Sequence, residues 1–226
     1  MSTPAHLPTV ETEPPKRANS CVIFMHGLGA DGHDFHPIVP HLELGPSHHV
    51  RFVFPHAPKR SVSLNGGFVM PAWFDVGAND LTRGESSDLP GLKKADAQIQ
   101  ALIEREVARG IPANKIVLGG FSQGGALATY SALRYSQPLA GLIALSTFLP
   151  RNVPLEAETT AANRALPVFG AHGTRDNVVL LSHGHKLRDR LVANGCEVEW
   201  HEYPMVHEVC LEEIAHWGAW IKAHLA

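Results

Sequence analysis

The chain has 226 residues, of which 44% are hydrophobic and 18% charged, so it is long enough to bury a substantial core and is not a disordered chain. Its formal net charge is −3 at pH 7, and its Lys and Arg residues are scattered. This argues against binding to nucleic acid or to an anionic membrane through bulk charge. The sequence contains no run of about 18 apolar residues that could span a bilayer.

Residues 1–19 contain four prolines and no apolar core segment, so we expect a flexible N-terminal arm rather than a signal peptide. Residues 20–226 are expected to form a single domain, because no repeat or low-complexity linker divides them. The three cysteines form no C-x-x-C pair, which favours free thiols and a cytoplasmic protein. The fifteen histidines lack a set of cysteines or carboxylates at ligand spacing, so we expect neither a metal site nor a cofactor.

Short apolar runs alternate with segments of helical period along the chain. Strands are predicted at 21–25, 51–54, 116–118, 139–145, 166–171 and 198–203, and helices at 87–109, 123–135, 181–193 and 211–224. In the first helix, Asp88 is a candidate N-cap, Pro90 lies in the first turn and Gly110 follows the end. The repeated order of strand and helix predicts an α/β fold with a mostly parallel central sheet and helices on both faces. Functional side chains are then expected at the carboxyl ends of the strands.

One segment, residues 60–80, interrupts this alternation with apolar residues that follow no helical period. We expect loops or short strands that either pack against the core or form a wall of the substrate pocket, with Leu64, Phe68 and Trp73 as pocket residues. Val178, in the loop after the strand 166–171, is assigned to the same pocket. A contact between two copies of the chain is an alternative use of the segment, so a homodimer is left open.

The residues Gly120-Phe121-Ser122-Gln123-Gly124 form a G-x-S-x-G sequence between a predicted strand and a predicted helix. In that context the pattern is typical of a nucleophile elbow, in which a strained turn exposes the serine hydroxyl above the sheet. The glycines are needed because side chains two residues before and after the serine would collide. The alternative is a Gly-rich turn with an idle serine.

A serine hydroxyl needs a base, and the elbow topology predicts the chain order Ser, Asp or Glu, then His, each after a strand. His207 follows the last predicted strand and is the candidate base, since the other late histidines lie within a predicted strand or helix (His201, His216 and His224). Asp176 is the acidic residue in the loop after the strand 166–171 and is the candidate partner of His207. For each alone, an ordinary loop residue would be the simpler interpretation.

Two backbone N–H groups should stabilise the negative charge of a tetrahedral intermediate. The candidates are the N–H of Gln123, at the start of the helix after the elbow, and the N–H of Leu28, in the Gly-rich loop after the first buried strand. A plain Gly-rich strand exit is the alternative for that loop.

Five segments taken together resemble a known family: MHGLGADGHDF, PHAPKRSVSLNGGFVMPAWFDV, GFSQGGALATYSAL, AHGTRDNVV and YPMVHEVCLEEI. They are similar to the carboxylesterase/acyl-protein thioesterase (lysophospholipase-like) family of α/β-hydrolases, and GADGHDF is similar to its bacterial carboxylesterase branch. The resemblance implies the same three triad residues and the same two N–H donors, and it matches 73–75 to a pocket-wall motif. One departure is Leu180, because the family often carries a proline soon after the Val-Val of the acid loop.

The resemblance implies hydrolysis of short to medium acyl esters through an acyl-enzyme intermediate, with some members acting on lysophospholipids or S-acylated proteins. The gap between 145 and 166 is short and holds no amphipathic helix, so no large lid is expected. A serine peptidase would usually need an extra domain or lid, for which this chain has no room. A non-catalytic binding protein should lack a triad member, and a cysteine-nucleophile hydrolase is excluded because position 122 is serine.

Overall fold

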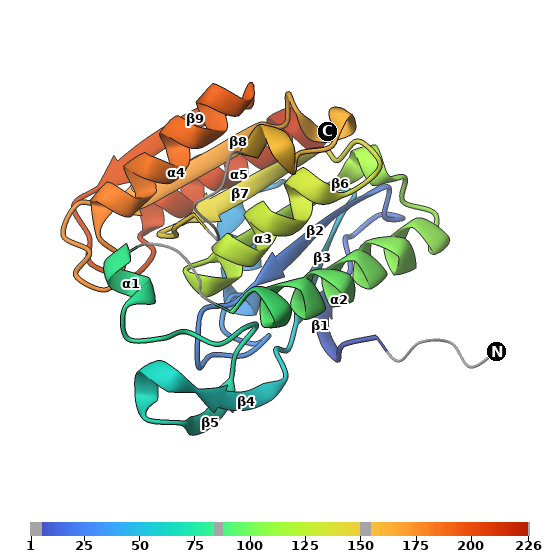
Figure 1. Ribbon diagram of the computed structural model, residues 1–226. Helices are drawn as coiled ribbons and strands as arrows, with labels where there is room; N and C mark the ends of the chain where they lie inside the picture. Colours follow the sequence, from blue (N-terminus) through green and yellow to red (C-terminus); the bar gives the residue numbers. More distant parts are fainter. Residues whose placement is uncertain (1–5, 84–87, 150–154, 226) are drawn as a thin grey trace.

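The computed structural model describes residues 6–83, 88–149 and 155–225 (Figure 1). Its main element is a seven-stranded sheet with the spatial order β1-β3-β2-β6-β7-β8-β9. In that order the strands are Thr9–Thr12, Val50–Pro55, Ser20–Met25, Ile116–Phe121, Gly141–Leu145, Pro167–Gly173 and Glu197–Tyr203. All neighbouring strands are parallel except β1, which pairs antiparallel with β3. The predicted α/β-hydrolase fold with a mostly parallel sheet is therefore confirmed.

Helices cover both faces of the sheet because the central strands bury side chains on both sides. In β2, Cys21, Ile23 and Met25 pack into a cluster with α2 (Leu89–Ala108), α3 (Gln123–Arg134) and α4 (Leu181–Asn194). Val22 and Phe24 face the opposite way, towards α5 (Leu211–Leu225) and the 3-10 helix η1 (His36–Leu42). Figure 1 shows α2 and α3 in front of the sheet and α5 behind it.

The remaining helical elements are short. They are the helix α1 (Asp80–Arg83) and the single 3-10 turns η2 (Ser63–Asn65), η3 (Ala113–Lys115), η4 (Leu155–Ala157) and η5 (Ala161–Asn163). Within the described part of the chain, no helix combines the length and the apolar character that a membrane span requires.

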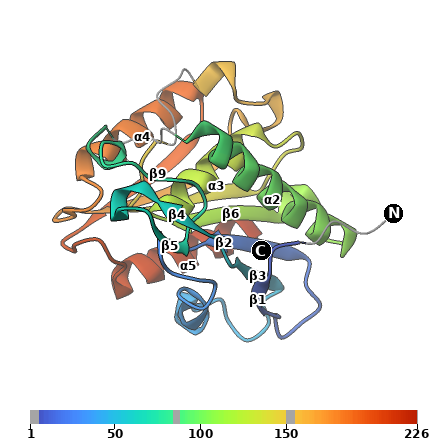
Figure 2. The same cartoon turned by 60° about the horizontal axis from the view of Figure 1, so that its bottom comes forward.

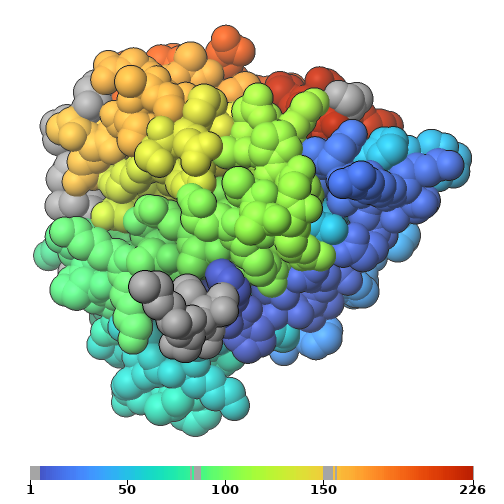
Figure 3. Space-filling view, turned by 90° about the vertical axis from the view of Figure 1, so that its right-hand side faces the viewer, coloured from blue at the N-terminus to red at the C-terminus, as the bar shows by residue number. Residues whose placement is uncertain are grey.

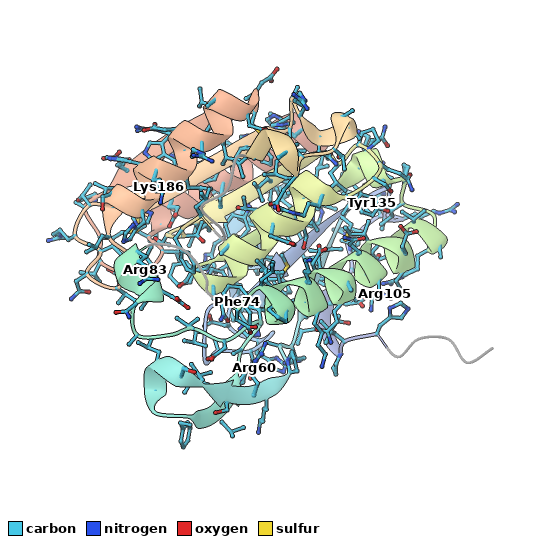
Figure 4. The ribbon with its side chains drawn as sticks, viewed as in Figure 1. Arg60, Phe74, Arg83, Arg105, Tyr135 and Lys186 are labelled. Carbon is cyan, nitrogen blue, oxygen red and sulfur yellow. The ribbon has the colours of Figure 1, made fainter. Side chains whose placement is uncertain are left out.

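The segment 60–80 forms a hairpin of β4 (Lys59–Val62) and β5 (Phe68–Pro71), as its lack of helical period predicts. Figure 1 shows this hairpin below the sheet, apart from the seven strands, and in Figure 2 it comes forward and lies in front of them. Its base is anchored by Arg60, which donates to Asp88 Oδ2 at 3.0 Å and to the carbonyl of Trp73 at 3.1 Å (Figure 4). Asp88 also accepts from the backbone N–H of Gly91 and caps α2, which confirms the predicted N-cap. The predicted helix start at Ser87 lies outside the described residues.

The prediction of a flexible arm up to residue 19 is wrong for residues 9–12, which form the edge strand β1. The arm is held by ion pairs as well as by the strand: Glu11 lies 2.7 Å from Arg105 of α2 and 2.8 Å from Arg109, which caps the end of that helix. Figure 3 shows the N-terminal segment lying directly beside α2. Because β1 pairs with β3 of the same sheet, we propose that it belongs to one domain with residues 20–226.

Glu213 in the first turn of α5 is an unusual buried carboxyl group. Its side chain is fully buried, and burial raises its pKa from 4.5 to about 8, partly offset by the backbone N–H of Cys210. In the unfolded chain the carboxyl group ionises near its ordinary pKa, whereas in the folded chain it stays protonated up to about pH 8. The contribution of the protonated Glu213 to the free energy of unfolding is therefore fully present below pH 4.5, where both states carry the proton. It is lost as the pH rises through about 8.

Replacing the buried carboxyl group with an amide should remove this pH dependence. Glu213→Gln is expected to raise the melting temperature relative to the wild type near pH 8 more than near pH 4.5. Thermal denaturation at the two pH values measures the effect. Glu212→Gln is the matched control, because it removes a carboxyl group of the same turn that is exposed to solvent. A difference between Glu213→Gln and wild type that is the same at both pH values would contradict the assignment.

Candidate active site

The turn between β6 and α3 holds Ser122 in a strained backbone conformation, with φ at 54° and ψ at −121°. The chain passes so tightly here that a Cβ at Gly120 would lie 2.3 Å from the backbone of Gly124. A Cβ at Gly124 would lie 2.2 Å from the carbonyl oxygen of Met25. The two glycines of the G-x-S-x-G pattern are therefore required by backbone contacts, as the sequence predicts.

Two hydrogen bonds from the neighbouring strand β7 and its exit loop fix the elbow. The N–H of Ser122 donates to the carbonyl of Leu145 at 2.9 Å, and the hydroxyl of Thr147 donates to the carbonyl of Ser122 at 2.6 Å. Because β6 and β7 lie in the middle of the sheet, these bonds place Ser122 at the carboxyl end of its central strands.

Asp176 and His207 follow β8 and β9, which are adjacent strands, and their side chains meet. His207 Nδ1 lies 2.7 Å from Asp176 Oδ2, while Asp176 Oδ1 accepts from the backbone N–H groups of Val178 and Val179 at 2.8 and 2.9 Å. Burial alone would raise the pKa of Asp176, but the hydrogen bond and charge of His207 and the two N–H donors together lower it. An ionised carboxylate can only accept, so His207 donates its Nδ1 proton and its Nε2 is free to act as a base.

Two aromatic rings support this pair. The ring of Phe121 lies 4.7 Å from that of His207, measured between centroids. His172 is fully buried behind Asp176, with its Nε2 2.8 Å from the carbonyl of Val179 and 3.5 Å from Asp176 Oδ2. Burial lowers the pKa of His172, so this second histidine is a neutral side chain that packs against the acid loop.

Ser122 and His207 line one cavity of about 310 Å³. The predicted donors Leu28 and Gln123 lie on it, and so do the predicted pocket residues Leu64 and Val178. The rest of its wall is Gly27, Ala30, Asp34, Val76, Leu81, Phe121 and Phe148. Phe148 follows the end of β7, so the rule that sites lie at strand ends could have found it, whereas nothing in the sequence singles out Leu81 of α1.

Two predicted pocket residues lie elsewhere. Trp73 has 1% of its surface exposed, and its indole N–H donates to the carbonyl of His26 at 2.9 Å. Phe68 has 68% of its surface exposed on the hairpin and does not line the cavity. The wall of this cavity therefore does not include these two predicted pocket residues.

A larger cavity of about 410 Å³ lies at the other end of the sheet, between the start of β3 and α5. It is lined by residues 44–50 together with Asn19, Ile221, Lys222 and Leu225, and it contains no member of the Ser-His-Asp set. The smaller cavity is therefore the candidate active site, because Ser122 and His207 line it. In the described part of the chain, no three or more His, Cys, Asp and Glu side chains gather as metal ligands would.

The chain is similar to known proteins both in sequence and in structure. A family model described as phospholipase/carboxylesterase matches residues 7–225. Acyl-protein thioesterase 1 of Cryptococcus neoformans var. neoformans is 36% identical over 237 residues, covering 98% of this chain and 99% of its own. Acyl-protein thioesterase 1 of Mycosarcoma maydis is 38% identical over 220 residues, covering 91% of each chain. The crystal structure of Zea mays acyl-protein thioesterase 2 superposes with a TM-score of 0.84 at 31% identity, covering 98% of this chain and all of that one.

A methyl group at Gly124 should disrupt this site. It would force apart the first turn of α3 and the carbonyls of Met25 and His26, which it would approach to 2.2 and 2.6 Å. Gly124→Ala is expected to lower kcat/KM for ester hydrolysis by about 100-fold or more, because small displacements of reacting groups are that costly. Gly77→Ala is the control, since its methyl group would come no closer than 3.6 Å to Asp80. A rate for Gly124→Ala near that of wild type would refute the tight approach.

Proposed function

The chain belongs to the phospholipase/carboxylesterase family and is a serine hydrolase of carboxylic esters or thioesters, and on that premise we propose that Ser122, Asp176 and His207 form its catalytic triad. The observation that carries the proposal is the arrangement of the three side chains. Ser122 stands on a strained elbow in the same cavity as His207, and His207 bonds to Asp176 at 2.7 Å.

In this proposal His207 Nε2 accepts the proton of the Ser122 hydroxyl as the oxygen attacks the carbonyl carbon of the substrate. The tetrahedral intermediate then collapses, the bond to the leaving oxygen or sulfur breaks, and His207 returns its proton to the leaving group. The acyl group stays on Ser122 until water, activated by the same histidine, releases it as a carboxylic acid. Asp176 fixes the tautomer of His207 and stabilises the imidazolium form in both steps.

We assign the oxyanion site to the backbone N–H groups of Leu28 and Gln123. Both residues line the cavity beside Ser122. Gln123 is the first residue of α3, so its N–H has no partner within the helix and lies at the positive end of the helix dipole. Preorganised donors of this kind stabilise the charge that develops on the carbonyl oxygen.

The cavity favours acyl groups of short to medium length. At about 310 Å³ it lies at the small end of ligand sites in proteins, and its walls include the apolar side chains of Leu64, Leu81, Phe148 and Val178. A second candidate function is the hydrolysis of S-acylated proteins, which the names of the fungal relatives favour. Lysophospholipids are a further substrate class within the same chemistry.

Location and assembly form part of the same proposal. The three free thiols of Cys21, Cys196 and Cys210 support a cytoplasmic location, where cysteines stay reduced. The exposed Phe68 and Val69 on the hairpin support a contact between two copies of the chain.

Fluorophosphonate probes should label the protein at Ser122 only. Ser122→Ala is expected to abolish labelling and to remove most of the hydrolytic activity, leaving up to about 10³-fold acceleration over water from binding and the oxyanion donors. Intact-mass spectrometry measures the labelling. Ser136→Ala, a change at an exposed serine, should label as the wild type does. A probe adduct that persists in Ser122→Ala would overturn the assignment of the nucleophile.

A series of p-nitrophenyl esters tests the proposed acyl length. Each buried methylene contributes about 0.8 kcal/mol, so kcat/KM should rise with chain length only until the chain outgrows the cavity. Phe148→Ala should shift the optimum to longer chains because it removes part of the wall, with the rate on acetate as the internal reference. An optimum at palmitate, with a jump in rate when the substrate forms micelles, would contradict a small cavity without a lid.

A further inference from the structure

A buried hydrogen-bond network joins the two segments that carry the proposed oxyanion donors, and Trp73 is at its centre. The indole Nε1–H of Trp73 donates to the carbonyl of His26 at 2.9 Å, next to the loop that contains Leu28. The backbone N–H of Trp73 donates to the side-chain Oε1 of Gln123 at 3.0 Å, and Gln123 Nε2 donates to the carbonyl of Phe74 at 2.8 Å. The side chain of Gln123 is thus fixed by a different segment of the chain from its backbone.

The side chains of this network are buried, and each of their hydrogen bonds has one possible donor and one possible acceptor. His26, Trp73 and Gln123 each expose 2% or less of their surface, so an unpaired donor or acceptor here would be costly. An N–H can only donate and a carbonyl can only accept, so the partners of Gln123 fix which end of its amide is oxygen. The network therefore has one arrangement of donors and acceptors.

The tautomer of His26 is fixed in the same way. The backbone N–H of Ala57 donates to His26 Nε2 at 3.1 Å, so Nε2 carries no proton. The proton is then on Nδ1, which donates to the carbonyl of Gly27 at 2.7 Å. Burial lowers the pKa of His26, in agreement with a neutral ring.

The bond from His26 to Gly27 has a direct consequence for the N–H of Leu28. The carbonyl of Gly27 and the N–H of Leu28 belong to one planar trans peptide unit, in which the two groups point in opposite directions. The ring of His26, together with the N–H of Ala30 at 3.3 Å, holds the carbonyl of Gly27 and so fixes the direction of the N–H of Leu28. A rotation of this peptide unit would turn the donor away and break the bond to His26.

The segment that carries Trp73 is itself anchored. Arg60 donates to the carbonyl of Trp73 at 3.1 Å, and Asp88 accepts from both Arg60 and the backbone N–H of Asp75, at 3.0 and 2.7 Å. Figure 4 shows Arg60 and Phe74 near each other where the hairpin meets the body of the molecule. The network thus extends from the oxyanion loop to the capped start of α2.

We infer that the side chains of His26, Trp73 and Gln123 are positioning residues that hold the N–H groups of Leu28 and Gln123 in place for the developing oxyanion. The inference rests on the proposed function, because it concerns the oxyanion site of that same reaction. Such a network acts on the transition state more than on the bound ester, since the negative charge exists only after attack. Its loss should lower kcat with little change in KM.

The test compares Trp73→Phe with wild type. The substitution keeps an aromatic ring in the core and removes the N–H that donates to His26. Trp200→Phe is the matched control, because the indole N–H of Trp200 donates to Glu202 on the edge strand β9, outside the cavity. For Trp73→Phe we expect kcat on p-nitrophenyl acetate to fall by about 10- to 100-fold, less than the loss of a whole oxyanion donor, with KM within a few-fold of wild type.

Two further readouts separate positioning from general damage. Affinity for an alkylboronic acid, which forms a tetrahedral adduct on the serine, should weaken by about the same factor as kcat. The pH at which activity reaches half its maximum should stay unchanged, because the pair of His207 and Asp176 is untouched. His26→Asn, which keeps a donor near the position of Nδ1, should retain more activity than His26→Leu, which has none.

The outcomes distinguish this inference from the proposed function. If kcat and boronate affinity of Trp73→Phe stay within two-fold of wild type, the network does not position the donors. The inference also fails if His26→Asn and His26→Leu are equally impaired. Should Trp73→Phe not fold, Gln123→Met replaces it as the test, and an unchanged kcat of Gln123→Met then contradicts the inference. If the boronic acid does not inhibit the wild type, the proposed function fails and the inference falls with it.

Discussion

The close packing of backbone on backbone at the serine elbow is the constraint on which the rest of the site depends. Ser122 adopts its positive φ where β6 ends directly against the first turn of α3, and Gly124 in that turn lies against the carbonyl of Met25 at the end of β2. One contact thus places the nucleophile, the start of the helix and the exit loop of the neighbouring strand side by side. A helix start and a strand exit that meet without side chains between them leave backbone N–H groups free to face a substrate.

Burial and hydrogen bonding then decide which polar groups near the serine carry charge. Asp176 is ionised despite its burial, because His207 and two backbone N–H groups stabilise the carboxylate. His172 and His26 are also buried, and burial lowers the pKa of each, in the case of His172 despite the nearby charge of Asp176, so both are neutral. The site therefore combines a carboxylate that is bonded to the one histidine open to the cavity with two neutral histidines that hold loops in shape.

Much of this could be predicted from the sequence, and the exceptions share a physical cause. The buried strands and the elbow follow from apolar runs and from glycines that no other residue can replace. β1 was missed because the sequence of Thr9–Thr12 has no apolar run, and its pairing and ion pairs depend on partners that are distant in sequence. The burial of Trp73 and the exposure of Phe68 could not be predicted, because hydrophobicity does not tell a pocket wall from a core side chain or an exposed hairpin residue. The role of the side chain of Gln123 likewise depends on Trp73 and Phe74, which lie 50 and 49 residues away in the chain.

The central claim is that Ser122 carries the acyl group between two half-reactions, and pre-steady-state kinetics test it most directly. Mixing excess p-nitrophenyl acetate with the enzyme should release a burst of p-nitrophenol equal to the enzyme concentration, followed by slower turnover, if deacylation limits the rate. Acid quenching during the burst, followed by peptide mass spectrometry, should recover the acetyl group on the peptide that contains Ser122. Recovery of the acetyl group on another residue, or turnover with no acetylated peptide at any time, would contradict the account.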